Sequence, residues 1–250
     1  MAVLILTLPL LGQDPLEIMK KSRDVVKVSS FEALSTLTIS DRRGNTRIRK
    51  NTMASKVFED GTEKRIIKFI DPPEVKGTGI LIYDREDKSD DMWIYLPALR
   101  KTRRIVSSEK SGSFMGSEFS NADMTAPGID DFSYEILGSE KLDGIECWKI
   151  SSSPTDMDLE DEYGYSKSIS WVGKNDYLVR KSDYYNFSGE LVKTIDNLDY
   201  KLLDPKAGKY MISERVAENH MNGRVSIMKM EKVQIAETND EYFSVAYLEK

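Results

Sequence analysis

Two residue types that often carry chemistry occur only once each in this 250-residue chain, as His220 and Cys147. A serine or cysteine nucleophile needs a base, which in most enzymes is a histidine. His220 lies beside Asn222-Gly223, a dipeptide typical of exposed hairpin turns, so we expect a surface side chain. Cys147 lies in the alternating segment ECWKISSS, where a buried thiol is expected. We therefore predict that the protein is not an enzyme.

The stretch SGSFMGSEFSNADM, residues 111–124, is rich in small residues and suggests two kinds of chemistry. Its spacing matches neither G-x-x-x-x-G-K-[ST] nor G-x-G-x-x-G, so a phosphate-binding loop is not supported. Ser111 or Ser113 could pair with Lys110, but the strained G-x-S-x-G turn that exposes a nucleophile is missing. We predict neither phosphate binding nor nucleophilic catalysis here.

The same stretch carries large apolar side chains, Phe114, Met115, Phe119 and Met124. On an exposed loop they would form an apolar patch that needs a partner. They could instead fold inward and complete the core, and the two interpretations merge if the core encloses a ligand. Methionine adapts well to varied apolar ligands, so we expect these side chains to contact a hydrophobic ligand.

The segment MWIYL, residues 92–96, has large apolar side chains at every position. Alternation places Trp93 and Tyr95 on one face and Met92, Ile94 and Leu96 on the other. This pattern indicates a central strand with apolar surroundings on both faces. The predicted hydrophobic ligand site therefore consists of Trp93, Tyr95, Phe114, Met115, Phe119 and Met124.

Five basic residues cluster just before the small-residue stretch: Arg100, Lys101, Arg103, Arg104 and Lys110. They are either solvated charges on an outer face or a patch for an anionic partner, such as a lipid headgroup, a membrane surface or an acidic protein. The net charge of the whole chain is −6, which argues against nucleic acid as that partner.

Acidic residues gather at residues 84–91 and 156–162, where carboxylates alone could bind a metal ion. Neither segment has the glycine and distal glutamate of a calcium-binding loop. Solvated hairpin tips explain both segments, and their charge also discourages pairing of strand edges. We predict no metal site and no cofactor.

The elements that must position these residues are mostly strands. Asp14-Pro15 predicts the start of a helix that ends near Lys27. After it, about ten alternating segments are separated by turn signals such as Asp143-Gly144 and Ser188-Gly189. This predicts a mainly β fold: one curved antiparallel sheet that forms an incomplete half β-barrel. The helix, the loop over 106–131 and the C-terminal segment NDEYFSVAYLEK are the candidates for a lid over its concave face.

The N-terminal residues 1–12 form an apolar run of the length of a signal-peptide core, with Gly12 before a possible cleavage point. The alternative is an apolar first strand or helix of the mature fold. We interpret residues 1–12 as the remnant of a signal peptide and residues 13–250 as a single domain.

The segments KFIDPPEVKGTGILIYD and DMWIYLPALRKTRRIVSSEKSGSFMGSEFSNADM resemble the LolA-like family of outer-membrane lipoprotein-sorting proteins. The resemblance covers residues 68–124. The matching positions are Lys76, Gly77, Thr78, Trp93, Tyr95, Leu96, Pro97, Leu99, Lys101, Arg103, Arg104, Ile105, Phe114, Met115, Gly116, Ser117, Phe119 and Asp123.

This resemblance implies a soluble, non-enzymatic periplasmic protein with a half-barrel fold and a helical lid. Its apolar cavity would bind the acyl chains of lipoproteins or other lipids, for transfer toward the outer membrane or together with an inner-membrane exporter, with transient membrane contact. The alternative is a scaffold subunit of the cell envelope that docks a transporter through its basic patch and has a dry, packed core.

Overall fold

The computed structural model describes residues 13–86 and 89–250, and within them the chain is mainly β. The segment 1–12, predicted to be a signal-peptide remnant, lies outside the described residues. In the two described ranges no helix has the length and apolar character that crossing a bilayer requires.

The described residues form thirteen strands and three α-helices. The helices are α1 (Pro15–Val25), α2 (Met157–Tyr163) and α3 (Val245–Leu248). The strands are β1 (Ser30–Ser40), β2 (Thr46–Val57), β3 (Glu63–Asp71), β4 (Gly79–Asp84), β5 (Asp91–Leu96), β6 (Lys101–Ile105), β7 (Phe132–Leu142), β8 (Ile145–Pro154), β9 (Lys167–Gly173), β10 (Val179–Tyr185), β11 (Leu191–Asp204), β12 (Lys209–Asn219) and β13 (Arg224–Ile235).

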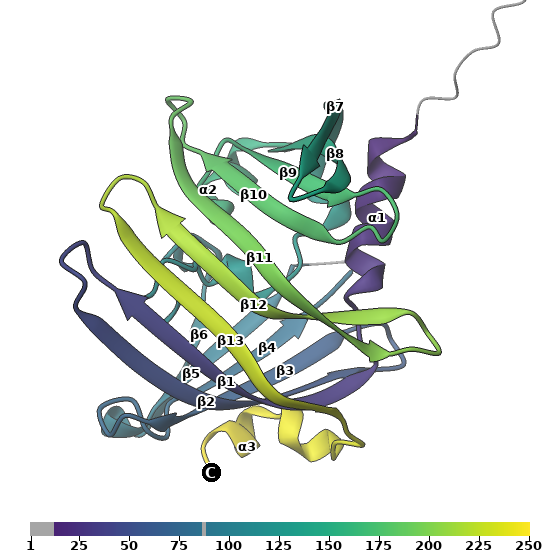
Figure 1. The fold of residues 1–250 in the computed structure, drawn as a ribbon. Coiled ribbons are helices and arrows are strands. Elements are labelled where there is room, and N and C mark those ends of the chain that lie inside the picture. Colours follow the sequence, from purple (N-terminus) through teal and green to yellow (C-terminus); the bar gives the residue numbers. More distant parts are fainter. Residues whose placement is uncertain (1–12, 87–88) are drawn as a thin grey trace, which may run out of the picture.

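All thirteen strands belong to one antiparallel sheet with the order β6-β5-β4-β3-β2-β1-β13-β12-β11-β10-β9-β8-β7. Figure 1 shows that this sheet curves strongly, so that it has a convex face and a concave face, whose side is here called the hollow. Every neighbouring pair is consecutive in sequence except β1 and β13, which join the first six strands to the last seven. The predicted half-barrel is confirmed, with thirteen strands in place of about ten. The assignment of residues 13–250 to a single domain stays a prediction.

Residues 106–131, here called the strap, connect β6 with β7 and so join the two edges of the sheet. Polar contacts fix the strap to strands far apart in the sheet. Arg224 Nη2 donates to the Gly116 carbonyl at 2.8 Å, and Arg65 Nη1 donates to the Met124 carbonyl at 2.6 Å. The strap therefore crosses the concave face from β13 to β3.

The main core lies on the concave face, under one end of the strap. Strand residues such as Leu37, Ile67 and Ile80 are almost fully buried there. Phe114 and Phe119 of the strap pack into the same cluster. The predicted loop over 106–131 is thus part of the lid, and its aromatic side chains point into the core.

Helix α1 begins where the sequence predicts, because the Asp14 side chain accepts a hydrogen bond from the Leu16 amide at 3.0 Å and Pro15 fills the first turn. Its buried residues are Ile18 and Ser22. Ile18 packs against Trp148 of β8, so the helix covers the β7–β9 side of the hollow (Figure 1).

The C-terminal segment covers the opposite, convex face, which corrects its assignment as a lid candidate for the concave face. Phe243 and Leu248 pack against Leu81. Leu81 alternates along β4 with Ile80 and Ile82, which belong to the concave core, so its side chain points to the other side of the sheet.

Candidate functional site

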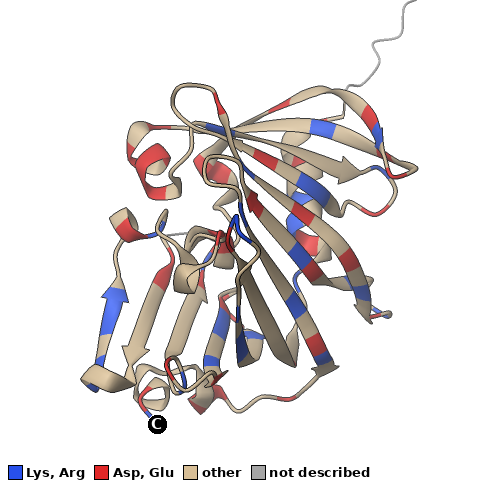
Figure 2. Cartoon of the chain, turned by 60° about the vertical axis from the view of Figure 1, so that its left-hand side comes forward, with Lys and Arg blue, Asp and Glu red and all other residues tan. Residues whose placement is uncertain are grey.

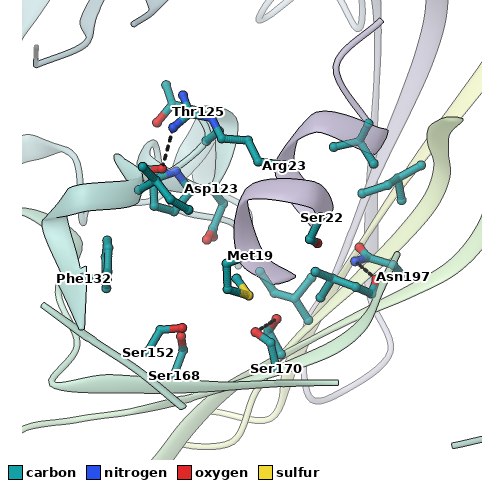
Figure 3. A pocket seen from close by; sticks show the side chains of 18 of the residues that line it. Met19, Ser22, Arg23, Asp123, Thr125, Phe132, Ser152, Ser168, Ser170 and Asn197 are labelled. Carbon is teal, nitrogen blue, oxygen red and sulfur yellow. Dashed lines mark hydrogen bonds between the residues drawn. The ribbon is translucent and has the colours of Figure 1, made fainter. Parts of the chain in front are cut away.

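A cavity of about 330 Å³ lies between α1, the strap and the concave face of the sheet. Its size is at the lower end of the range for small-molecule sites. Figure 3 shows Met19 of α1 pointing toward Phe132 and the serines of the sheet, whereas Arg23 extends toward the strap, where it donates to the Pro127 carbonyl at 3.1 Å. The cavity is therefore bordered by three parts of the chain that are far apart in sequence.

One wall of the cavity is largely apolar. Its apolar side chains come from α1 and the residue after it, the strap and the strand that follows the strap: Met19, Val26, Met124, Ala126, Pro127, Ile129 and Phe132. Polar and charged side chains of the same segments border them: Ser22, Arg23, Lys27, Asp123 and Thr125. The Phe132 ring lies 4.9 Å from the Tyr163 ring, centroid to centroid. Such a wall can cover an apolar chain without requiring directional contacts.

The facing wall, on the sheet, combines the apolar side chains of Val179, Ile195 and Ile212 with polar ones. It carries a series of small polar side chains from β8 to β11, here called the polar row: Ser152, Ser168, Ser170, Ser182 and Asn197. All five are buried. The hydroxyls of Ser170 and Ser182 lie 2.8 Å apart and form a hydrogen bond.

Three tyrosines also border the cavity: Tyr134, Tyr165 and Tyr184. The ring centroids of Tyr165 and Tyr184 lie 5.0 Å apart. Burial raises the pKa of both hydroxyls above their usual value, and the charge of nearby Asp123 adds to the effect. Both phenols therefore stay neutral at physiological pH and can serve as hydrogen-bonding groups.

Asp123 of the strap is held by two strands of the sheet. Its carboxylate pairs with Lys193 of β11 at 2.7 Å, and its carbonyl accepts a hydrogen bond from Arg215 of β12 at 3.2 Å. Burial alone would raise the pKa of this carboxyl, but Lys193 and Arg215 hold it below its usual value. Asp123 is therefore ionised, and it ties the strap to the sheet.

Asp84, at the end of β4, connects three elements. Its carboxylate accepts from Arg23 of α1 at 3.2 Å and from the Ala126 amide of the strap at 2.7 Å. Burial, together with repulsion from Asp90 and Glu63, raises its pKa to about 7. Asp84 thus titrates near neutral pH at the junction of helix, strap and sheet.

Of the six residues predicted to bind a hydrophobic ligand, only Met124 lines this cavity. Phe114 and Phe119 are buried in the concave core, where the Phe114 ring lies 6.4 Å from that of Phe69, and Met115 packs against the same core. These three side chains pack in the core beside the cavity, and their role in ligand binding is untested.

Trp93 and Tyr95 lie on the convex face, where they pack in the cluster that contains Phe243 and Leu248. The predicted alternation of this strand is confirmed, because Met92 belongs to the concave core and Trp93 to the convex cluster. The same alternation separates Trp93 and Tyr95 from the strap residues, so the structure does not bring the six together.

The five predicted basic residues do not form one surface patch. Lys110 is buried, with its ammonium 2.5 Å from Glu162 of α2 and 3.9 Å from Asp90. This corrects its placement in the patch. The acidic helix α2 lies beyond the end of β6 (Figure 2), and its Glu162 pairs with Lys110.

The other four basic residues lie on or next to the edge strand β6. Arg103 pairs with Glu109 at 2.7 Å, and Arg104 pairs with Asp91. Arg100 and Lys101 are exposed and form no ion pair with any residue in the described ranges. Charged side chains on an edge strand discourage pairing with another chain, and this explains their position without a ligand.

The polar row was not among the predicted site residues. The only sequence pattern that could have indicated the polar row is the alternation of serine with large apolar residues in KISSS and KSISW. Serine at every second position normally indicates a solvated outer face. The long-range pairing of the strands reverses this assignment, because Ile150, Ser152, Ser168 and Ser170 all face the hollow.

A protein-family model with the description "uncharacterized protein" matches residues 61–250. Among solved structures, a DUF1329 family protein from Desulfovibrio piger is 28% identical with a TM-score of 0.85, and the alignment covers 94% of this chain and 99% of that one. Comparison with curated proteins gives no match.

Two further solved structures are similar along their whole length. An outer membrane lipoprotein-sorting protein domain from Vibrio parahaemolyticus is 26% identical with a TM-score of 0.86, covering 94% of this chain and 98% of that one. A LolA superfamily protein from Nitrosomonas europaea is 19% identical with a TM-score of 0.72, covering 93% and 98%. The last of these supports the fold alone.

Proposed function

The chain belongs to the LolA-like family, and on that basis we propose that it is a carrier that shields acyl chains of lipoproteins or other lipids in the cavity under α1 and the strap. We place it in the periplasm, where it would move its cargo toward the outer membrane or work with an inner-membrane exporter, with transient membrane contact. In this proposal it binds and does not catalyse, and it needs no cofactor.

The observation that carries this proposal is the partly open cavity under α1 and the strap, one wall of which is largely apolar. The interior of most proteins is filled by side chains, because an empty apolar cavity reduces stability. Here α1 and the strap roof over a space on the concave face that their own side chains leave open. A carrier requires such a space.

The energetics of binding favour a chain over a compact ligand. Each buried methylene contributes about 0.8 kcal/mol, so a chain of about ten methylenes would gain roughly 8 kcal/mol before the cost of association. Part of that gain is lost to ordering the ligand and the site. The remainder suits a carrier that has to release its cargo.

Filling the cavity from α1 tests the proposal. Ser22 is buried on the cavity side of the helix. We expect Ser22→Trp to weaken the binding of a fluorescent fatty acid by about tenfold or more, because the indole occupies the space of the chain. Lys20→Trp, at an exposed position of the same helix, is the matched control and keeps wild-type affinity. Equal affinity of all three proteins would contradict binding in this cavity.

One observation favours the alternative, a scaffold that docks a transporter. Leu99 is exposed beside Arg100 and Lys101, and Val106 is exposed at the other end of β6. These side chains form a mixed apolar and basic surface of the kind that protein partners bind. A scaffold of this type would bind its partner with the cavity filled by Ser22→Trp, whereas a carrier would lose its cargo.

A further inference from the structure

The two walls of the cavity differ in chemistry, and this difference restricts the ligand. The polar row (Ser152, Ser168, Ser170, Ser182 and Asn197) lies on the sheet wall together with Val179, Ile195 and Ile212, opposite the apolar side chains of α1 and the strap. Four of its members are labelled in Figure 3. A carrier for bare hydrocarbon would have alanine or valine at these positions, because burying a hydroxyl against an apolar chain costs free energy.

Polar atoms of the row lack hydrogen-bond partners within the described part of the chain. These are Ser152 Oγ and Asn197 Oδ1. Ser152 lies directly opposite Ser168 in the β8–β9 register, but no hydrogen bond joins the two side chains. Buried polar groups are nearly always paired, with protein or with ordered water, so a ligand that offers hydrogen-bonding groups, or keeps water beside them, fits here better than bare hydrocarbon does.

Asn197 also indicates what such a ligand must donate. Its Nδ2 donates to the Val179 carbonyl at 2.6 Å, which fixes the orientation of the amide. The free atom is therefore the amide oxygen, which can only accept a hydrogen bond. A carboxylate, an ester carbonyl or an ionised phosphate oxygen cannot donate to it, whereas a hydroxyl can.

The length of the row excludes a single small group. The row runs from β8 to β11, three steps of about 4.8 Å each, so its ends lie about 14 Å apart across the sheet. Only a headgroup with several oxygens could contact a substantial part of this distance. The serine hydroxyls both donate and accept, and they suit a set of neighbouring hydroxyls.

We propose that the cavity binds a lipid with a hydroxylated, polyol-type headgroup, such as a glycerol or sugar, and that this headgroup enters the cavity and bonds to the polar row. The inference rests on the proposed carrier function and specifies its cargo. The acyl chain lies against the apolar wall of α1 and the strap, and the headgroup faces β8–β11.

The test compares two ligands with the same chain, monododecanoylglycerol and methyl dodecanoate, of which only the first carries hydroxyls. Each competes with a fluorescent fatty acid for the wild-type protein. We expect the glycerol ester to bind about tenfold more tightly, which corresponds to one or two net hydrogen bonds. Equal affinities would overturn the inference.

The double variant Ser152→Ala/Ser168→Ala removes two hydroxyls without adding bulk. It should weaken binding of monododecanoylglycerol by about fivefold to tenfold and leave methyl dodecanoate unchanged or tighter. Ser151→Ala, on the same strand with its side chain on the other face, is the control and changes neither. Thermal unfolding checks that all variants are folded.

A reversed orientation of the ligand would also be recognised by these measurements. If the chain lay on the polar row, replacing hydroxyls by hydrogen would strengthen the binding of both ligands, and the inference would be wrong while the carrier function stood. If the wild-type protein bound neither ligand and no fluorescent fatty acid, the carrier function itself would be contradicted.

Discussion

At the scale of single residues, the least expected feature is an aspartate that titrates near neutrality where three elements meet. Asp84 accepts hydrogen bonds from Arg23 and from the Ala126 amide. Its pKa is nevertheless raised to about 7, because burial and the negative charges of Asp90 and Glu63 outweigh these favourable contacts. Ionisation of one side chain therefore affects the junction of α1 with the strap.

The stability of the protein should depend on pH through Asp84. Because its pKa is higher in the folded than in the unfolded state, the folded state binds more protons between about pH 4 and pH 7. The free energy of unfolding therefore falls as pH rises through this window, by a contribution on the order of a few kcal/mol. Asp84→Asn should reduce the difference between unfolding at about pH 5 and at about pH 8 in urea titrations.

The control for this prediction is Asp158→Asn, at an exposed position of α2, which should retain the wild-type pH dependence. An unchanged pH dependence in Asp84→Asn would show that Asp84 is not the titrating group. The amide oxygen of asparagine can still accept a hydrogen bond from the Ala126 amide. The variant therefore keeps that contact and removes only the titrating group.

At the scale of elements, the strap is stabilised by buried charges as well as by apolar packing. Lys193 pairs with buried Asp123 in the middle of the concave face, whereas Arg103 and Glu109 pair on the surface. Removing one partner of a buried pair leaves the other charge without compensation, but a surface pair contributes little. Asp123 and Glu109 of the strap therefore differ in how much their ion pairs contribute to stability.

We expect Asp123→Ala to lower the free energy of unfolding by about 2 to 4 kcal/mol, because Lys193 would remain partly buried without its partner. Hydrogen exchange in the strap should accelerate more than exchange in the central strands. The matched change Glu109→Ala should cost less than about 1 kcal/mol, since both members of that pair are half-exposed. Equal effects of the two changes would contradict a structural role of Asp123.

Much of the element structure can be predicted from the sequence because strands and turns are local patterns. Alternation in MWIYL predicts an apolar strand with two faces, and the structure confirms it. What alternation cannot supply is which face points to the hollow. That depends on pairings such as β1 with β13, which join residues about 200 positions apart. Serines of β8 and β9 therefore resembled an outer face although they line the cavity.

The six residues predicted to bind a hydrophobic ligand do not lie together for the same reason, and their binding role stays a prediction. Trp93 and Phe114 are close in sequence and similar in character, but the sheet lies between them. Of the strap residues that match the family pattern, Phe114, Met115 and Phe119 pack in the core beside the cavity, and Asp123 lines the cavity. Similar apolar side chains can pack or bind, and only the three-dimensional arrangement distinguishes the two.

At the scale of the whole molecule, a single sheet with two open edges is bridged by the strap and roofed by α1 (Figure 1). A sheet of thirteen strands that curves without closing leaves a hollow that side chains of the sheet cannot fill. The strap and α1 close this hollow incompletely, and the cavity results. The proposed carrier function is thus a consequence of the architecture more than of any single residue.

Native mass spectrometry of the purified protein tests this account most directly. The account predicts species heavier than the polypeptide by the mass of a lipid, which disappear after organic extraction and return when a lipid is added back. Ser22→Trp should show the polypeptide mass alone, because its cavity is filled. A wild-type protein that carries no lipid, and takes up none when a fluorescent fatty acid or monododecanoylglycerol is added, would contradict the account.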